Sequence, residues 1–213
     1  DEQGKTTTLG RGGSDYSAAL LAEVLNAQDV LIWTDVAGIY TTDPRIVSNA
    51  QRIDTMSFSE AAEMATFGAK VLHPATLLPA VRSNIPVYVG SSKAPQDGGT
   101  WVTRNPQPRP TFRAIALRRD QTLLTLSSLN MLYAQGFLAN IFTILAKHKI
   151  SVDTITTSEV SVALTLDKTG SASSGKSLLS QELIEELSQF CTVKVDTGLS
   201  LVALIGNELH TAF

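Results

Sequence analysis

A run of alternating prolines in the middle of the chain, Asn105-Pro106-Gln107-Pro108-Arg109-Pro110, limits what this sequence can fold into. Each proline fixes φ and lacks an N–H donor, so neither a helix nor a central strand can continue through the segment. The stretch therefore predicts an extended linker over residues 106–111, with one domain over residues 1–105 before it and further structure after it.

Before the linker, helical patterns alternate with short apolar runs. Ser14-Asp15 can cap one helix, Ser57-Phe58-Ser59-Glu60 has the pattern of a capping box, and Pro74 suits the first position of another helix. The apolar runs are nearly continuous, as in strands buried on both faces. This alternation predicts an α/β domain built on a parallel sheet. The expected elements are helices over residues 16–27, 58–72 and 74–84 and strands over residues 29–35 and 86–90.

After the linker, the pattern predicts the order βαββαβ, which is the ferredoxin-like arrangement. A turn is expected at Thr157-Ser158-Glu159, between the second and third strands. Gly206-Asn207-Glu208-Leu209 echoes Ser128-Leu129-Asn130-Met131, so residues 112–198 predict one module and residues 199–213 the start of a second copy. The expected elements are strands over 115–126, 152–156, 160–166 and 193–205 and helices over 137–148 and 178–190.

Composition excludes several classes of protein. The net charge of −3 and the scattered Lys and Arg residues argue against a nucleic-acid partner. No apolar run approaches the ~18 residues of a membrane span, and residues 1–5 lack the basic-then-apolar pattern of a signal peptide. One cysteine and three histidines argue against an internal disulfide and a structural zinc site. We therefore expect a cytoplasmic protein that contacts neither nucleic acid nor membrane.

The first segment that can carry chemistry is Thr6-Thr7-Thr8-Leu9-Gly10-Arg11-Gly12-Gly13-Ser14-Asp15. Its glycines allow close backbone approach to a ligand, and the following helix offers free N–H groups to an anion. Arg11 has the geometry to bind a carboxylate or phosphate, whereas Asp15 suits a cation such as a substrate ammonium, a catalytic lysine or a metal. The alternative is a capped helix after a glycine turn.

A second segment, Trp33 to Arg45, follows an expected buried strand, where α/β folds bind ligands. Tyr40 can stack on a base, and Arg45 and the more distant Lys70 can neutralise phosphates. The alternatives are a turn at Asp43-Pro44 and a solvated lysine at a helix end.

A third segment, Gly170-Ser171-Ala172-Ser173-Ser174-Gly175-Lys176-Ser177, matches the phosphate-binding P-loop pattern. Its serine- and alanine-rich middle is typical of a flexible linker, and it lies within the βαββαβ series rather than in a crossover to a parallel strand. We therefore interpret it as a surface loop.

Three segments together resemble the aspartokinase family, and above all its lysine-sensitive, monofunctional members. Residues 6–16 resemble the family's substrate loop, residues 33–45 its nucleotide loop, and Phe67-Gly68-Ala69-Lys70-Val71-Leu72-His73-Pro74 continues the match. The resemblance covers essentially the whole chain and is weakest over residues 105–110 and 168–180.

The resemblance implies a carbamate-kinase-like, amino-acid-kinase domain followed by ACT regulatory domains. The implied reaction transfers the γ-phosphoryl group of ATP to the β-carboxylate of L-aspartate, with Mg²⁺ as a cofactor for which we assign no protein ligand. It gives 4-phospho-L-aspartate, at the start of lysine, threonine and methionine biosynthesis. Arg11 and Asp15 are the implied catalytic residues. The implied aspartate-binding residues are Thr8, Arg11, Ser14 and Asp15, and the implied ATP-binding residues are Thr34, Asp35, Tyr40, Arg45 and Lys70.

In the ACT region the resemblance implies feedback inhibition by L-lysine and a homodimer formed through ACT domains. Asp153 and Glu159 can meet the two ammonium groups of lysine, and N–H groups near Gly136 can meet its carboxylate. The alternative is a capped helix followed by a hairpin. The implied effector residues are Met131, Tyr133, Ala134, Gly136, Phe137, Leu138, Ser151, Val152, Asp153, Thr157, Ser158 and Glu159.

One departure from the family pattern matters for activity. The family's Lys-Phe-Gly-Gly-Thr segment, which supplies the catalytic lysine, does not occur in these 213 residues. We therefore expect the chain to be an incomplete aspartokinase that by itself transfers no phosphoryl group. A non-catalytic lysine-sensing module and another amino-acid kinase, such as glutamate 5-kinase, are the alternatives.

Overall fold

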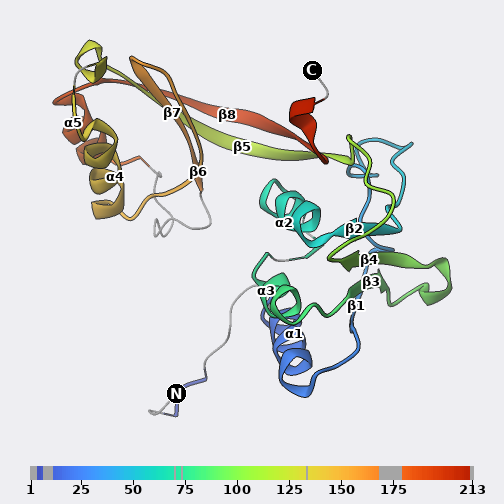
Figure 1. The fold of residues 1–213 in the computed structure, drawn as a ribbon. Helices are drawn as coiled ribbons and strands as arrows, with labels where there is room; N and C mark the ends of the chain where they lie inside the picture. The colour runs from blue at the N-terminus through green and yellow to red at the C-terminus, as the bar shows by residue number, and fades with distance from the viewer. Residues whose placement is uncertain are drawn as a thin grey trace. The chain divides into compact units, whose positions relative to one another are not determined.

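The computed structural model describes residues 4–6, 12–69, 71–72, 74–132, 134–167 and 179–211. The chain forms two compact units, residues 1–118 with 202–213 and residues 119–201. Strands β5 (Ala114–Ser127) and β8 (Thr192–Ile205) both cross this division, so the chain enters and leaves the second unit through them (Figure 1). The proline-rich segment 106–111 has neither helix nor strand, as predicted, and it belongs to the first unit.

The first unit contains a four-stranded mixed sheet with the strand order β1-β3-β4-β2. Strands β1 and β3 are parallel and so are β2 and β4, whereas β3 and β4 form an antiparallel pair joined by the short helix η1. The predicted parallel pairing is thus confirmed, but β2 and β4 were not predicted. The elements are α1 (Gly13–Leu25), β1 (Val30–Thr34), β2 (Thr55–Ser57), α2 (Phe58–Thr66), α3 (Pro74–Ser83), β3 (Val87–Ser91), η1 (Pro95–Asp97), β4 (Gly99–Thr103) and η3 (Leu209–Thr211).

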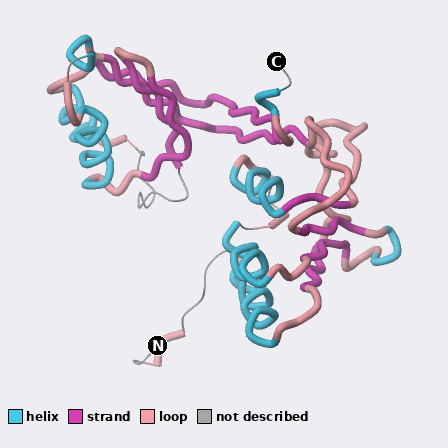
Figure 2. Tube along the Cα trace, in the orientation of Figure 1, coloured by secondary structure: helices cyan, strands magenta, loops and turns pink. Residues whose placement is uncertain are grey.

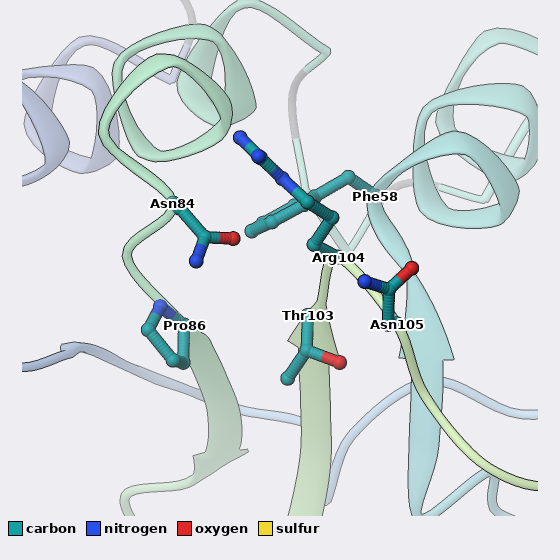
Figure 3. Close-up of a pocket in the computed structure, with 6 residues that line it drawn as sticks. All are labelled: Phe58, Asn84, Pro86, Thr103, Arg104 and Asn105. Carbon is teal, nitrogen blue, oxygen red and sulfur yellow. The ribbon is translucent and has the colours of Figure 1, made fainter.

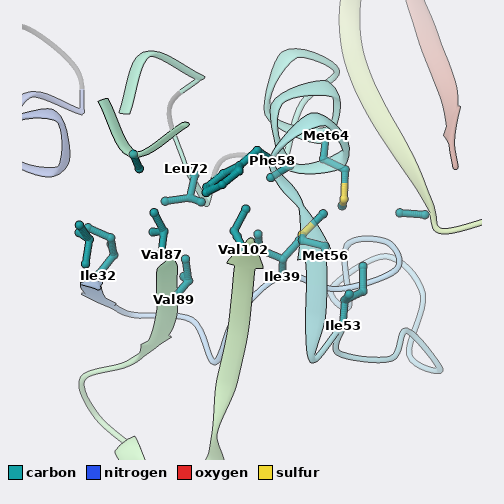
Figure 4. Close-up of a cluster of buried hydrophobic side chains, with 14 of the residues drawn as sticks. Ile32, Ile39, Ile53, Met56, Phe58, Met64, Leu72, Val87, Val89 and Val102 are labelled. Carbon is teal, nitrogen blue, oxygen red and sulfur yellow. The ribbon is translucent and has the colours of Figure 1, made fainter. Parts of the chain in front are cut away.

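Alternate side chains of the strands build the core of this unit. Ile32, Val87, Val89 and Val102 point to one face of the sheet, where they pack with residues of the helices (Figure 4). Trp33 points to the other face and is 47% exposed, and its ring contacts that of Tyr88. The prediction that residues 29–35 are buried on both faces is therefore wrong for the described part of the chain.

Two helix boundaries differ from their predictions for local reasons. Helix α1 begins at Gly13, because Gly12 adopts a left-handed N-cap conformation with φ of 73° and no side chain caps the helix. Helix α2 has the predicted capping box at Ser57 and Glu60 but ends at Thr66. Gly68, with φ of 120°, then turns the chain away from the helix.

The second unit has the predicted ferredoxin-like order. Its sheet runs β6-β7-β5-β8, and helices α4 and α5 contribute to a single core with strands β5 and β7 (Figure 1). Ile141 of α4 and Leu183 of α5 are fully buried in this core. No helix in the described ranges is long and apolar enough to cross a membrane. The remaining elements are η2 (Leu129–Leu132), α4 (Phe137–Lys147), β6 (Ser151–Thr157), β7 (Ser161–Asp167) and α5 (Gln181–Ser188). The P-loop-like segment lies outside the described residues.

Candidate functional site

The carboxyl ends of the parallel strands β1 and β3 meet at one edge of the first sheet. Thr34 pairs with Ser91 in the register of the two strands. The carbonyl oxygen of Thr34 accepts hydrogen bonds from the backbone N–H and the hydroxyl of Ser92, at 2.8 and 3.0 Å. The Thr34 hydroxyl lies 3.2 Å from a carboxylate oxygen of Asp35, to which it donates. Two predicted ATP-binding residues therefore stand at the edge where α/β sheets bind ligands.

The predicted aspartate-binding residues Ser14 and Asp15 lie in the first turn of α1. The Ser14 hydroxyl donates to an Asp15 carboxylate oxygen at 3.3 Å. Because α1 and β1 are joined by a short turn, the start of α1 lies at the same end of the unit as the carboxyl end of β1. The half-buried Asp15 carboxylate suits a cationic group better than a phosphate. Thr8 and Arg11 lie outside the described residues.

The long excursion between β1 and β2 carries Tyr40 and Arg45 and is drawn mostly as loop in Figure 2. It folds back on itself, because the N–H of Ile53 donates to the Ile39 carbonyl at 2.8 Å and Tyr40 forms a β-bridge with Arg52. Arg52 also donates to a carbonyl oxygen of Asp97. The excursion is thus a hairpin-like loop held against the connection between β3 and β4.

Thr100 of β4 fixes the base of this loop. Its fully buried hydroxyl accepts the N–H of Ile39 at 2.8 Å and donates to the Ile53 carbonyl at 2.6 Å. Gly38 has φ of 116°, and a Cβ atom there would lie 2.6 Å from the Thr100 hydroxyl. This position therefore requires glycine, and Thr100 holds the residue before Tyr40. Thr100 was not predicted as part of the site.

Arg45 is already paired with a carboxylate. Its guanidinium donates two hydrogen bonds to Asp43, at 2.7 and 3.0 Å, and its backbone N–H donates a third at 2.9 Å. The hydrogen bond from the Arg45 side chain lowers the pKa of Asp43 from 3.8 to about 2. Asp43 therefore orients Arg45 and neutralises part of its charge. The sequence Asp43-Pro44-Arg45 could have indicated this ion pair, but we interpreted Asp43-Pro44 only as a possible turn.

The fifth predicted ATP-binding residue, Lys70, lies outside the described residues. The chain leading to it is fixed by two hydrogen bonds, from the N–H of Phe67 to the Glu63 carbonyl at 2.9 Å and from the N–H of Ala69 to the Met64 carbonyl at 2.8 Å. Helix α2 therefore sets the direction in which the chain approaches Lys70.

The predicted effector residues fall into two groups within the second unit. One group surrounds the end of β6 and the start of α4, where the Ser128 N–H donates to the Val160 carbonyl at 3.0 Å and Gly136 caps α4 with φ of 81°. The predicted turn is confirmed between Thr157 and Ser161. This group contains Met131, Ala134, Gly136, Phe137, Leu138, Thr157, Ser158 and Glu159, and Tyr133 lies outside the described residues.

The other group, Ser151, Val152 and Asp153, lies at the opposite end of β6. Asp153 falls at a register shift in the pairing of β6 with β7, where a β-bulge can re-aim a side chain. At ~3.3 Å per residue, Asp153 and Thr157 are about 13 Å apart along the strand. Asp153 and Glu159, the two predicted partners of the lysine ammonium groups, therefore lie toward opposite ends of β6.

Two pockets lie away from most of these residues. A pocket of about 230 Å³ is at the opposite end of the first sheet from Thr34, between Phe58, Pro86 and Thr103 (Figure 3). Its Arg104 guanidinium donates to the Val81 carbonyl at 3.0 Å, so this cation has a partner within the protein. A second pocket, of about 240 Å³, lies in the second unit between Leu129 and Val160, beside the first effector group.

No group of three or more metal-ligating side chains occurs among the residues that the structure describes. Asp35 offers a single exposed carboxylate at the ligand-binding edge of the sheet. Magnesium in nucleotide sites is held by one or two carboxylates together with substrate phosphates. The Asp35 carboxylate therefore suits a magnesium ion that arrives with a nucleotide.

We expect Thr100→Val to loosen the loop that carries Tyr40. The substitution removes a buried hydroxyl and leaves the Ile39 N–H and the Ile53 carbonyl without it, which costs about 1–3 kcal/mol. Hydrogen exchange of the Ile39 amide should accelerate accordingly. Thr103→Val, on the same strand but partly exposed, is the control and should leave this amide unchanged; equal protection in both variants would disprove the role of Thr100.

The ion pair in the loop predicts an unusual titration. In the chain, the Asp43 carboxyl should titrate near pH 2, and Arg45→Gln should return its pKa toward 3.8, because the side-chain hydrogen bond is lost. Carboxyl carbon shifts measured by NMR against pH test this. Arg82→Gln, in a different element, should leave the pKa of Asp43 low, and a low value in the Arg45 variant would contradict the assignment.

Comparisons with known proteins agree with this geometry. A family model described as "Amino acid kinase family" matches residues 1–91. Over the whole chain, 70% of residues are identical with the lysine-sensitive aspartokinase 3 of Escherichia coli (strain K12), of which the match covers 47%. The chloroplastic aspartokinase 3 of Arabidopsis thaliana is 42% identical over 97% of this chain and 37% of that protein. The chain thus spans about half the length, or less, of these relatives.

Solved structures give the same result. Aspartokinase III of E. coli in complex with aspartate and ADP, in its R-state, matches with a TM-score of 0.87 and 71% identity over 98% of this chain and 47% of that one. The same enzyme with lysine and aspartate, in its T-state, matches with a TM-score of 0.83 and 70% identity over 97% and 46%. Clostridium acetobutylicum aspartate kinase matches with a TM-score of 0.80 and 28% identity over 94% and 46%. The chain is therefore a homologue of the aspartokinases, and its residues 1–91 match the amino acid kinase family.

Proposed function

We propose that this chain is part of an aspartokinase, which transfers the γ-phosphoryl group of ATP to the β-carboxylate of L-aspartate. The observation that carries the proposal is the 70% identity with the E. coli enzyme over the whole chain. That enzyme has been solved with aspartate and ADP. A cytoplasmic location is part of this proposal.

The chain's own residues support an alignment role. Phosphoryl transfer requires positioning and neutralisation of charge more than covalent chemistry. Asp15 at the start of α1 orients the substrate ammonium or the catalytic lysine, while Ser14, Thr8 and Arg11 hold the carboxylates of aspartate. These roles agree with the half-buried Asp15 carboxylate beside the Ser14 hydroxyl.

On the nucleotide side, Thr34 and Asp35 line the edge of the sheet, Tyr40 stacks on the base, and Arg45 and Lys70 approach the phosphates. The Asp43 carboxylate keeps the Arg45 fork in one orientation, which favours recognition of a planar or tetrahedral anion over a mobile contact. Magnesium bound to the phosphates would neutralise charge during transfer, and Asp35, at the edge of the sheet, is the carboxylate that would hold it.

The second unit binds L-lysine as an effector and forms a homodimer. Strand β6 lies at an edge of its sheet, where unpaired backbone groups can pair with another chain. Antiparallel pairing of two β6 strands about a two-fold axis would place Asp153 of one chain near Glu159 of a second copy. Two copies would therefore complete the effector site whose halves lie at opposite ends of β6.

In the full-length protein, we expect Asp15→Asn to lower kcat/KM for L-aspartate by about 10- to 100-fold, since a charge-assisted hydrogen bond is lost. Aspartate-dependent release of ADP measures this. Asp29→Asn, in the turn after α1, should behave like the unaltered protein. If the unaltered protein releases no ADP with aspartate, but does so with glutamate, the glutamate-kinase alternative holds instead.

A mixing experiment tests the shared effector site. Asp153→Asn and Glu159→Gln should each weaken L-lysine binding by about 10- to 100-fold in calorimetry, because each removes a charged partner. When the two variants are mixed and allowed to exchange subunits, each mixed dimer regains one intact site. Recovery of tight binding in the mixture is the expected result, whereas no recovery would place the whole site within one chain.

A further inference from the structure

A carboxylate buried at the start of helix α2 connects parts of the first unit that are far apart in sequence. The Glu60 side chain is 3% exposed, and one of its oxygens accepts the Ser57 N–H at 2.7 Å, which closes the capping box of α2. Its other oxygen accepts hydrogen bonds from the Arg113 guanidinium at 2.9 Å and from the side-chain amide of Asn207 at 2.8 Å. The capping box alone uses only one of these oxygens, so Glu60 does more than begin a helix.

The two further partners of Glu60 mark the ends of the strands that lead to the second unit. Arg113 directly precedes β5, and Asn207 follows β8 after one residue. The same two side chains also fix the proline-rich linker, since Arg113 donates to the Pro108 carbonyl at 2.9 Å and Asn207 to the Pro110 carbonyl at 3.0 Å. The chain's only two covalent connections with the second unit are therefore both anchored on Glu60.

The other end of α2 is attached to β5 as well. The Arg118 guanidinium donates to the Thr66 carbonyl, in the last turn of α2, at 3.3 Å. Gly68 packs so closely on β5 that a Cβ atom there would lie 2.7 Å from the Leu117 carbonyl oxygen. Helix α2 is thus held to β5 at both ends, and the chain continues directly from it to Ala69 and the predicted ATP-binding Lys70.

We propose that Glu60, Arg113 and Asn207, which we call the α2 junction, couple the effector unit to the ATP loop through helix α2. This inference rests on the proposed function. A displacement of β5 or β8 on effector binding would pull on Glu60 and Thr66 and so change the position of the segment Gly68–Ala69 that leads to Lys70. Glu60 is then a positioning residue, which acts on the nucleotide through α2 and touches no substrate.

A coupling role requires two states and an element that both sites influence. The E. coli relative has been solved as an R-state with aspartate and ADP and as a T-state with lysine and aspartate. Helix α2 is short and attached at both ends, so it moves as one piece with the strands that hold it. Interfaces of this kind have discrete arrangements and do not deform continuously.

The test uses the full-length protein and the factor by which saturating L-lysine raises KM for ATP or lowers kcat. Asn207→Ala cuts one connection to Glu60 while Arg113 still pairs with the buried charge, and Glu60→Gln removes the charge itself. We expect this factor to shrink by at least about fivefold in both variants, within the usual range of allosteric coupling. L-lysine should still bind in calorimetry, and kcat of the Asn207 variant without lysine should stay within about twofold of the unaltered protein.

Asn105→Ala is the matched control, because the Asn105 side chain accepts a hydrogen bond from the nearby Arg109, at 2.7 Å, and lies outside the α2 junction. It should keep the full lysine effect. Full lysine inhibition in both junction variants would overturn the proposal, since a role confined to folding would lower stability and basal activity without altering the ratio.

Hydrogen exchange over residues 61–69 separates this inference from the proposed function. L-lysine should change the protection of these amides in the unaltered protein and not in Asn207→Ala, whether or not the protein phosphorylates aspartate. If no aspartate-dependent ADP release occurs but this difference is seen, the proposed function fails and the junction stands. If lysine leaves these amides unchanged in the unaltered protein, the junction is disproved.

Discussion

The arrangement of the first unit depends on one buried carboxylate. Burial by itself would raise the pKa of Glu60, but hydrogen bonds from Arg113, Ser57 and Asn207 outweigh it and hold the pKa below its usual value. Glu60 is therefore ionised at neutral pH, and its stabilising effect is complete above the pKa of the unfolded chain and disappears as pH falls through the lowered pKa. A buried charge of this kind is costly if any partner is lost, so the start of α2, the linker and the turn after β8 must stay together.

The sequence was sufficient for elements whose signals are local. The ferredoxin-like order was predictable for two reasons. The buried residues within α4, such as Ile141, and within α5, such as Leu183, recur at helical spacing, and strand and helix patterns alternate clearly. Strand β2 has only three residues, too few for a periodic signal, and β4 begins at Gly99 directly after a turn, so its start resembled a loop. Burial of β1 on both faces was inferred from its continuous apolar run, but the run does not distinguish a buried Ile32 from an exposed Trp33.

The residues of the candidate site also divide into those with a local sequence signal and those without one. Ser14, Asp15, Thr34 and Asp35 were predictable, because strand ends and helix starts determine which residues reach the edge of a parallel sheet. Thr100 and Asn207 were not, since each acts on a group far away in sequence, Ile39 at 61 residues and Glu60 at 147 residues. No local pattern reports a hydrogen bond of that separation. The ion pair of Asp43 with Arg45 was predictable, because an aspartate stands two residues before an arginine. A turn at the intervening proline accounted for the same residues, so the pair was not recognised.

The long strand β5 belongs to both units of the chain. Its Leu123–Ser127 end pairs residue by residue with β7, and the next residue, Ser128, is bonded to Val160 beside the predicted effector turn. Its opposite end places Ala114 and Ala116 in the core of the first unit, next to α2. Asp120, with φ of 56°, departs from extended backbone close to the division between the two units, so the strand is not uniformly extended there. The proposed coupling therefore depends on what holds the first-unit end of β5 in place. Glu60 and its two partners lie at that end of β5.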